Sequence, residues 1–191
     1  MLKRLGILLS GRGSNFKSIY DAIQNKKLQA QIACVISNKA DAQGLKNAQE
    51  LKLPAFYLDT KNAASKANYE EQIVKLLKQH NCDLIILAGY MRLVGKTLLD
   101  AFPNRILNIH PSLLPAFKGL NAQKQALDYG VKLTGCSVHI VNEEMDGGKI
   151  LAQCSVVVLE NDTEDSLSNR ILDKEHQLYP QTIQTFLKNL V

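Results

Sequence analysis

The stretch Asp83-Leu-Ile-Ile-Leu-Ala-Gly-Tyr-Met-Arg92 decides the fold class. Its apolar run, Leu84 to Ala88, is almost continuous, as expected for a strand that is buried on both faces in the middle of a parallel sheet. Shorter strand-like segments are found at 5–9, 32–36 and 105–109. Helical spacing of apolar residues lies between these segments, and strands that alternate with helices predict an α/β fold with right-handed crossovers.

The remaining segments extend this pattern. We predict a strand at 53–58 and helices beginning near Phe16, at 42–51, from Ser65 to about His80, and at 122–129. The segments 134–141 and 150–159, joined by an acidic turn, predict a hairpin. The last helix starts at Asp162 or Thr163, with Pro180 as a kink or break. We therefore expect one domain with a mostly parallel, Rossmann-like sheet flanked by helices, a C-terminal hairpin and a long final helix.

Length and composition narrow the function classes. A chain of 191 residues suits one domain, and a net charge of +5 without a basic run excludes a nucleic-acid arm but favours anionic small molecules. The four cysteines form no CxxC pair and lie in or beside apolar runs, which favours a reducing, cytoplasmic location. No segment is a signal peptide or a membrane span.

The segment Ser10-Gly-Arg-Gly-Ser-Asn15 follows the first strand, and its residues 11–15 form a glycine loop that opens the first helix. Such a loop presents backbone N–H groups and a helix N-terminus to an anion. A dinucleotide site would require a third glycine at Phe16 and an acidic residue after the second strand, which instead ends in Ser37-Asn38. The loop therefore predicts a phosphate site, the alternative being a tight turn without a ligand.

A second polar segment, Asn108-Ile-His-Pro-Ser-Leu-Leu-Pro-Ala-Phe-Lys-Gly119, begins at the end of the predicted strand at 105–109. The two-residue period of a strand places Asn108 and His110 on one face. His110 is either a structural histidine or part of a site. In open α/β sheets ligands bind beyond the carboxyl ends of the strands, where residues 11–15, 90–92 and 108–110 would converge. We therefore expect the site at this edge.

Six motifs together resemble one enzyme family. They are Ser10–Asn15, Val35–Asn38, Ala88–Arg92, Asn108–Pro115 with Phe117–Gly119, Gly135–His139 and Asp146–Ile150. This set, in this order from about residue 5 to residue 180, is similar to the folate-dependent glycinamide ribonucleotide formyltransferases of purine synthesis. The resemblance implies the formyltransferase fold, a phosphate-binding half at about 1–105 and a catalytic and folate-binding half at about 106–191.

The resemblance also implies roles for individual residues. The catalytic set is Asn108, His110 and Asp146. The substrate phosphate and ribose are bound by Gly11, Arg12, Gly13, Ser14, Asn15 and Glu175. The folate pocket involves Lys66, Met91, Arg92, Leu93, Asn108, Val141, Asn142, Glu143 and Glu144, with Lys66 aligned where relatives often have an arginine that meets the glutamate tail. The implied co-substrate is 10-formyltetrahydrofolate, and no metal is implied.

The chemistry of formyl transfer fits these residue types. The reaction passes through a tetrahedral intermediate with a negative oxygen, which an amide N–H of Asn108 and a protonated His110 can stabilise. Asp146 would favour the imidazolium and relay protons toward the leaving nitrogen. The histidines at 80, 139 and 176 lack metal-ligand spacing. Ser112 lacks a nucleophile elbow, which argues against acyl-serine chemistry.

The alternative functions differ in the extra domains that they require and in the residues that they explain. A formyltetrahydrofolate hydrolase is expected to carry a regulatory domain before the glycine loop, and a methionyl-tRNA formyltransferase a domain after the last helix; this chain is expected to have neither. A non-catalytic phosphate- or nucleotide-binding module would explain the loop but not Asn108, His110 and Asp146 together. We expect small-molecule substrates, no nucleic acid or membrane partner, and a monomer or homodimer.

Overall fold

The strands form a single mixed sheet. The structure, a computed structural model, describes residues 1–190, so the predicted domain's last residue, Val191, lies outside the described residues. The seven strands have the order β3-β2-β1-β4-β5-β6-β7. Their bounds are β1 Lys3–Leu9, β2 Ala30–Ser37, β3 Ala55–Tyr57, β4 Leu84–Leu87, β5 Ile106–His110, β6 Leu133–Ile140 and β7 Ile150–Val157. The predicted α/β class and hairpin are confirmed.

Strand direction brings the polar segments to one edge. Strands β1 to β5 are parallel, whereas β6 runs antiparallel to β5 and β7 antiparallel to β6. Leu87 pairs with Leu8 on one side and with Asn108 on the other. The carboxyl ends of β1, β4 and β5 therefore lie side by side, where crossover connections leave room for ligands.

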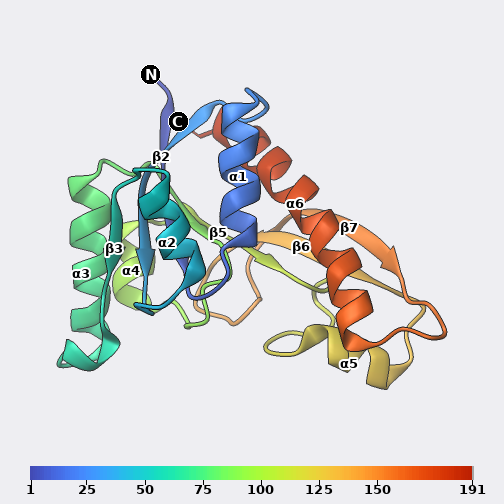
Figure 1. Ribbon diagram of the computed structural model, residues 1–191. Coiled ribbons are helices and arrows are strands. Elements are labelled where there is room, and N and C mark those ends of the chain that lie inside the picture. Colours follow the sequence, from blue (N-terminus) through green and yellow to red (C-terminus); the bar gives the residue numbers. More distant parts are fainter. Residues whose placement is uncertain (191) are drawn as a thin grey trace.

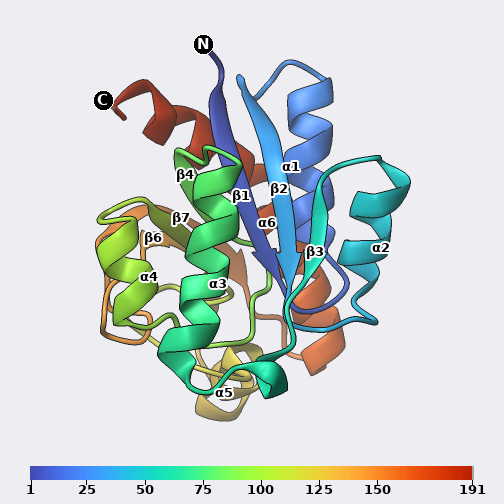
Figure 2. The same ribbon diagram turned by 90° about the vertical axis from the view of Figure 1, so that its left-hand side faces the viewer.

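Helices cover both faces of the sheet (Figures 1 and 2). Their bounds are α1 Ser14–Gln24, α2 Gln43–Glu50, α3 Lys66–Gln79, α4 Lys96–Ala101, α5 Ala122–Tyr129 and α6 Glu164–Lys188, with a 3-10 turn at Thr60–Asn62. The apolar faces of α1, α2 and α6 pack in one core layer, and those of α3 and α4 in the other. In Figure 1, α3 and α4 lie on one side of the strands and α1 and α6 on the other.

The sequence of strand β4 shows why its central place in the sheet could be predicted. Leu84 and Ile86 belong to one core layer, while Ile85 and Leu87 belong to the other, and all four are at most 4% exposed. A strand with two buried faces needs apolar residues at every position rather than at alternate ones. The prediction of a central strand from this run is therefore confirmed.

Two local features differ from expectation. Helix α6 continues through Pro180 without a break, because buried side chains on either side of the proline, Tyr179, Ile183 and Leu187, hold it against the sheet. Helix α4 was not predicted; its first turn is capped by Glu70 of α3, whose carboxylate accepts hydrogen bonds from the amides of Gly95 and Leu98. A cap supplied by another helix leaves no local sequence signal.

Candidate active site

His110, the last residue of β5, has both ring nitrogens engaged. Its Nε2 lies 2.8 Å from the carbonyl oxygen of Phe117, and because a carbonyl only accepts, Nε2 carries a proton. Its Nδ1 lies 3.4 Å from Oδ2 of Asp146. The ring is buried, so these two partners fix its orientation. The His110 ring is therefore fixed in position and carries a proton on Nε2.

Asp146 lies between two imidazoles. Its Oδ2 accepts a hydrogen bond from the Gly119 amide at 2.9 Å, and its Oδ1 lies 3.6 Å from Nε2 of His139. Burial alone would raise the pKa of Asp146, but hydrogen bonds from His139 and the Gly119 amide, with the charge of His110, lower the pKa below its ordinary value. Asp146 is therefore a carboxylate at neutral pH.

Asn108 is connected to Asp146 through His139. Its Nδ2 lies 3.1 Å from His139 Nε2, and the two residues are paired across β5 and β6. His139 Nδ1 faces the Ile140 carbonyl at 3.2 Å, so Nδ1 donates; Nε2 then accepts from the Asn108 amide while the ring is neutral, and donates to Asp146 Oδ1 only when it also carries a proton. The second N–H of that amide is then directed by His139 and available to a substrate oxygen.

His139 is the residue to which the sequence analysis gave no role in the site: it lies in the motif Gly135–His139 and was otherwise considered only as a metal ligand. The available signal was the hairpin: an antiparallel partner for β5 in the observed register places His139 opposite Asn108. The structure thus brings together the predicted Asn108, His110 and Asp146 and adds a fourth member. Their catalytic roles stay predictions.

The segment after His110 is fixed by the hairpin strands. Ser137 Oγ donates to the Ser112 carbonyl and accepts from the Leu114 amide, and Gln153 Nε2 donates to the Leu114 carbonyl. The Leu114-Pro115 peptide is cis. The Ser112 hydroxyl donates to the Ala116 carbonyl at 2.5 Å, so it serves the turn. These bonds hold the Phe117 carbonyl opposite His110.

The glycine loop, residues 11–15, meets helix α6 at a buried pair. Asn15 Nδ2 donates to Glu175 Oε2 at 2.7 Å, and both side chains are buried. Burial raises the pKa of Glu175 to about 7, although the hydrogen bond from Asn15 opposes the shift. Asn15 Oδ1 has no hydrogen-bond partner among the described residues. The predicted ribose residue, Glu175, therefore does lie beside the predicted phosphate loop.

The loop backbone is shaped for close approach. Gly13 has φ 75° and precedes the first residue of α1, and a Cβ placed on it would lie 2.6 Å from the Cα of Gly44. A Cβ placed on Gly11 would meet nothing within 4 Å. Gly13 is thus required by packing, whereas Gly11 faces open space where an anion can approach the amides.

The predicted folate residues lie in two groups. Met91 and Leu93 are exposed after β4, and the Arg92 guanidinium lies 5.4 Å from the centre of the Tyr69 ring. Lys66, the first residue of α3, is close to the same segment, since a Cβ placed on Gly95 would lie 2.9 Å from its Cε. Exposed apolar side chains beside two cations suit an amphipathic anionic ligand.

The second group belongs to the loop after β6. Val141 packs against the core layer of α3 and α4, and Asn142 Oδ1 accepts from the Glu144 amide. Glu144 also forms a 2.7 Å ion pair with Lys118, and Glu143 is exposed. The structure therefore links this loop to the segment that follows His110, but shows no contact that assigns Glu143 a role.

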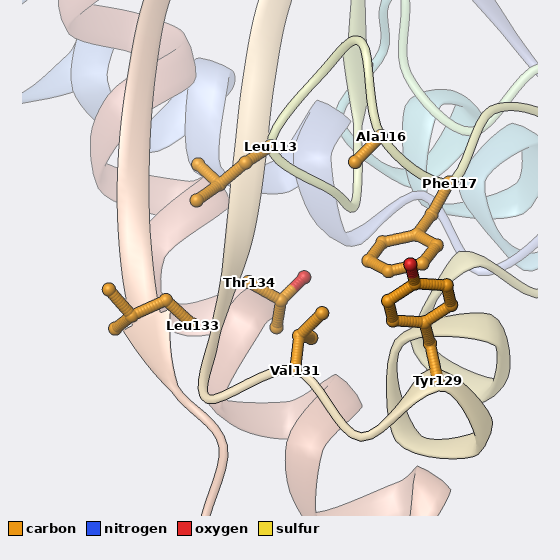
Figure 3. A pocket seen from close by; sticks show the side chains of 7 residues that line it. All are labelled: Leu113, Ala116, Phe117, Tyr129, Val131, Leu133 and Thr134. Carbon is orange, nitrogen blue, oxygen red and sulfur yellow. The ribbon is translucent and has the colours of Figure 1, made fainter.

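A separate apolar hollow lies behind the 113–117 segment (Figure 3). It has a volume of about 350 Å³, and its wall includes Phe117 and Tyr129, whose rings meet edge-on at 5.9 Å. None of the predicted catalytic side chains lines it. It is therefore distinct from the polar cluster at the end of β5.

Residues 1–190 show neither a group of metal-binding side chains nor a membrane-spanning helix. They contain no group of three or more His, Cys, Asp or Glu side chains placed to hold a metal ion. None of the helices in this range combines the length and apolarity that a membrane span requires.

Comparison with known proteins identifies the family. The family model described as formyl transferase matches residues 3–183. The chain belongs to the formyl transferase family. The resemblance stated from the six motifs is thereby confirmed, and members of this family are enzymes.

Named relatives cover nearly the whole chain. Phosphoribosylglycinamide formyltransferase of Bacillus subtilis is 41% identical over 186 residues, which cover 97% of this chain and 95% of that protein. The human trifunctional purine biosynthetic protein adenosine-3 is 39% identical over 181 residues, which cover 95% of this chain but only 18% of the larger protein.

Solved structures of the family have the same fold. Glycinamide ribonucleotide transformylase 1 of Symbiobacterium toebii superposes with a TM-score of 0.97 at 46% identity, covering 98% of this chain and 89% of that one. The corresponding enzyme of Geobacillus kaustophilus gives 0.95 at 42% identity, covering 98% and 100%. The sheet, its flanking helices and the long last helix are therefore those of the family.

Proposed function

We propose that this protein transfers the formyl group of 10-formyltetrahydrofolate to the amine of glycinamide ribonucleotide. In this reaction a new C–N bond forms at the formyl carbon, the bond to folate N10 breaks, and one proton passes from the substrate amine to N10. Three tasks follow: to anchor the ribonucleotide, to anchor the folate, and to stabilise charge between them.

The glycine loop anchors the ribonucleotide phosphate. Its backbone amides and the N-terminus of α1 supply partial positive charge, and Arg12 is an exposed cation in the same loop. Ser14 and Asn15 supply polar contacts beside it. Buried Glu175, with Asn15, accepts or donates hydrogen bonds to the ribose hydroxyls, which is consistent with its raised pKa.

The folate contacts the segment after β4 and the loop after β6. Met91 and Leu93 pack against the pteridine and the ring that follows it, with Val141, Asn142, Glu143 and Glu144 on the opposite side. Arg92 and Lys66 face the glutamate tail as cations. Lysine keeps the charge that an arginine would bring but not its two-pronged hydrogen bonding, so Lys66 acts as a point charge.

Asn108 and His110 act on the formyl oxygen and the leaving nitrogen. The amide N–H that His139 leaves available donates to the oxygen as it becomes negative. Because His110 Nε2 already donates to the Phe117 carbonyl, the second donor to this oxygen is the protonated Nδ1, which lies 3.4 Å from Asp146. Asp146 offsets the positive charge of the attacking amine and carries its proton toward N10, directly or through water. The observation that carries this proposal is the cluster in which Asp146 lies between His110 and His139.

Steady-state turnover tests the proposal. The protein is mixed with 10-formyltetrahydrofolate, with and without glycinamide ribonucleotide, and tetrahydrofolate release is followed by absorbance. We expect release that depends on the amine. Release that proceeds equally without the amine identifies a hydrolase, and no release in either case points to a binding module.

We further propose the finer properties of the protein. Residues 1–191 act as one domain, with phosphate binding in about 1–105 and catalysis and folate binding in about 106–191. The protein works in the cytoplasm on small molecules, without nucleic acid, as a monomer or homodimer. The free cysteines and the dispersed charge of +5 support this proposal.

A further inference from the structure

Ser10, the residue just before the glycine loop, connects the ends of three strands. Its side chain is 3% exposed. Its Oγ donates to Asn38 Oδ1 at 2.6 Å, after β2, and accepts from the Met91 amide at 2.8 Å, after β4. Its backbone amide donates to the Gly89 carbonyl at 3.0 Å. One buried hydroxyl thus ties β1, β2 and β4 together where the chain leaves the sheet.

The groups on the two sides of Ser10 serve different substrates in the proposed function. Gly11, the next residue, begins the glycine loop, and its carbonyl accepts from the Gly44 amide at the start of α2. Met91 begins the folate wall, which we define as residues 91–93. The side chains of Met91 and Leu93 are exposed and Arg92 lies over the Tyr69 ring, so the position of the wall also depends on backbone contacts such as the one to Ser10.

We propose that Ser10 is a positioning residue that couples the glycine loop to the folate wall. This inference rests on the proposed function and adds a role that the catalytic set does not contain. When the ribonucleotide phosphate orders the glycine loop, the hydroxyl of Ser10 is held in place and fixes the Met91 amide, so the folate meets an ordered wall. By linkage, bound folate must tighten ribonucleotide binding by the same factor.

The hydroxyl is suited to this role because it both donates and accepts. Alanine at this position would leave the side-chain oxygen Oδ1 of Asn38 and the Met91 amide without their partner in a partly buried place, which costs more than a neutral exchange of hydrogen bonds. The two orphaned groups lie on different segments, so each is free to shift separately. We therefore expect Ser10→Ala to weaken the effect of one bound substrate on the affinity for the other, as well as to lower the stability of the protein.

The experiment measures binding of tetrahydrofolate by calorimetry, alone and with saturating glycinamide ribonucleotide. Tetrahydrofolate has no formyl group, so no reaction occurs. In the wild-type protein we expect the ribonucleotide to tighten tetrahydrofolate binding by about fivefold or more. In Ser10→Ala we expect this ratio to fall to within about twofold of unity, and separate turnover assays should give KM values for both substrates that are raised by on the order of tenfold.

Ser37→Ala is the matched control. Ser37 is also a fully buried serine at this sheet edge, and its Oγ likewise donates once and accepts once, but both bonds go to Lys39 within its own turn. Ser37→Ala should keep the wild-type ratio of tetrahydrofolate affinities with and without the ribonucleotide. Asn38→Ala, at a half-buried position, removes the acceptor of the Ser10 hydroxyl and should lower the ratio even if Ser10→Ala does not fold.

Three outcomes overturn the coupling: a wild-type ratio of one, a folded Ser10→Ala or Asn38→Ala with the wild-type ratio, or an equal loss in Ser37→Ala. The proposed function fails separately, if the wild-type protein shows no amine-dependent turnover. A protein that turns over normally but shows any of the three outcomes retains its function and loses only this role of Ser10.

Discussion

Asp146 Oδ2 lies 3.4 Å from Nδ1 of His110, while the other oxygen of the same carboxylate faces His139. One acid therefore serves two rings, and through His139 it is connected to the Asn108 amide. Removing its charge should disturb the charge balance of the whole cluster without emptying the space that it fills.

Asp146→Asn is expected to lower kcat by about 10²- to 10³-fold, the loss typical of a removed electrostatic contact at the reacting atoms. The fold should persist, because Asp146 has φ 49°, a conformation that asparagine tolerates, and an amide oxygen can still accept from Gly119. Steady-state kinetics and ribonucleotide binding measure both effects. Asp128→Asn, an exposed change on α5, is the control, and near-normal turnover of Asp146→Asn would remove Asp146 from the mechanism.

Asn108→Ala and His110→Ala should be strongly non-additive, since both donors serve one oxyanion. We expect each single variant to lose about 10²- to 10³-fold in kcat/KM, and the double variant to be little slower than the slower single one. A double-mutant cycle of kcat/KM measures the interaction. Losses that multiply would mean that the two residues act on separate atoms.

Glu175→Gln should remove a pH dependence of stability. The pKa of Glu175 is raised from 4.5 to about 7, so between these values the unfolded state loses the proton first. The free energy of unfolding therefore falls as pH rises from about 4.5 to 7, by roughly 3 kcal/mol at most. Glutamine stays neutral and can still accept from Asn15, so the variant should be the more stable protein at pH 8 while losing affinity for the ribonucleotide.

Denaturant unfolding at pH 4, 6 and 8 measures this slope. Exposed Glu50→Gln at the end of α2 is the control and should retain the wild-type slope. If Glu175→Gln also retains it, the buried carboxyl is not the group that titrates.

Two glycine variants should have different effects: Gly13→Ala should lower stability, and Gly11→Ala should weaken ligand binding. Gly13 has φ 75° and no room for a Cβ beside Gly44, so its replacement should cost about 2 kcal/mol or more of stability. Gly11→Ala meets no protein atom and should leave the melting temperature within a few degrees, yet weaken ribonucleotide binding because the methyl group stands where the phosphate approaches. Thermal melts and titrations test the pair; unchanged affinity in Gly11→Ala would contradict the phosphate assignment.

The sequence was informative wherever one chain segment carries the whole signal. The apolar run of β4, the glycine loop and the span of α5 are local patterns, and the structure has each of them. Features that need two segments were harder to predict. The cap of α4 comes from Glu70 on α3, and α6 passes through Pro180 because the sheet supports it.

In the candidate site, too, residues within one segment were predictable, whereas contacts between two segments were not. Asn108 and His110 share one strand, so their convergence was predictable from the strand period. His139 was not recognised, because its contact with Asn108 depends on the antiparallel register of β5 and β6. The contact of Asn15 with Glu175 joins residues 160 positions apart, so only the resemblance could suggest that Glu175 belongs to the site.

The most direct measurement of the central claim follows the formyl carbon itself. 10-Formyltetrahydrofolate labelled with ¹³C in the formyl group is incubated with the protein and glycinamide ribonucleotide, and the products are separated and weighed by mass spectrometry. We predict that the label appears on the ribonucleotide amine in step with tetrahydrofolate release, and that Asp146→Asn slows both equally. Label recovered only as free formate, or no label transferred at all, would contradict the claim that this protein is a glycinamide ribonucleotide formyltransferase.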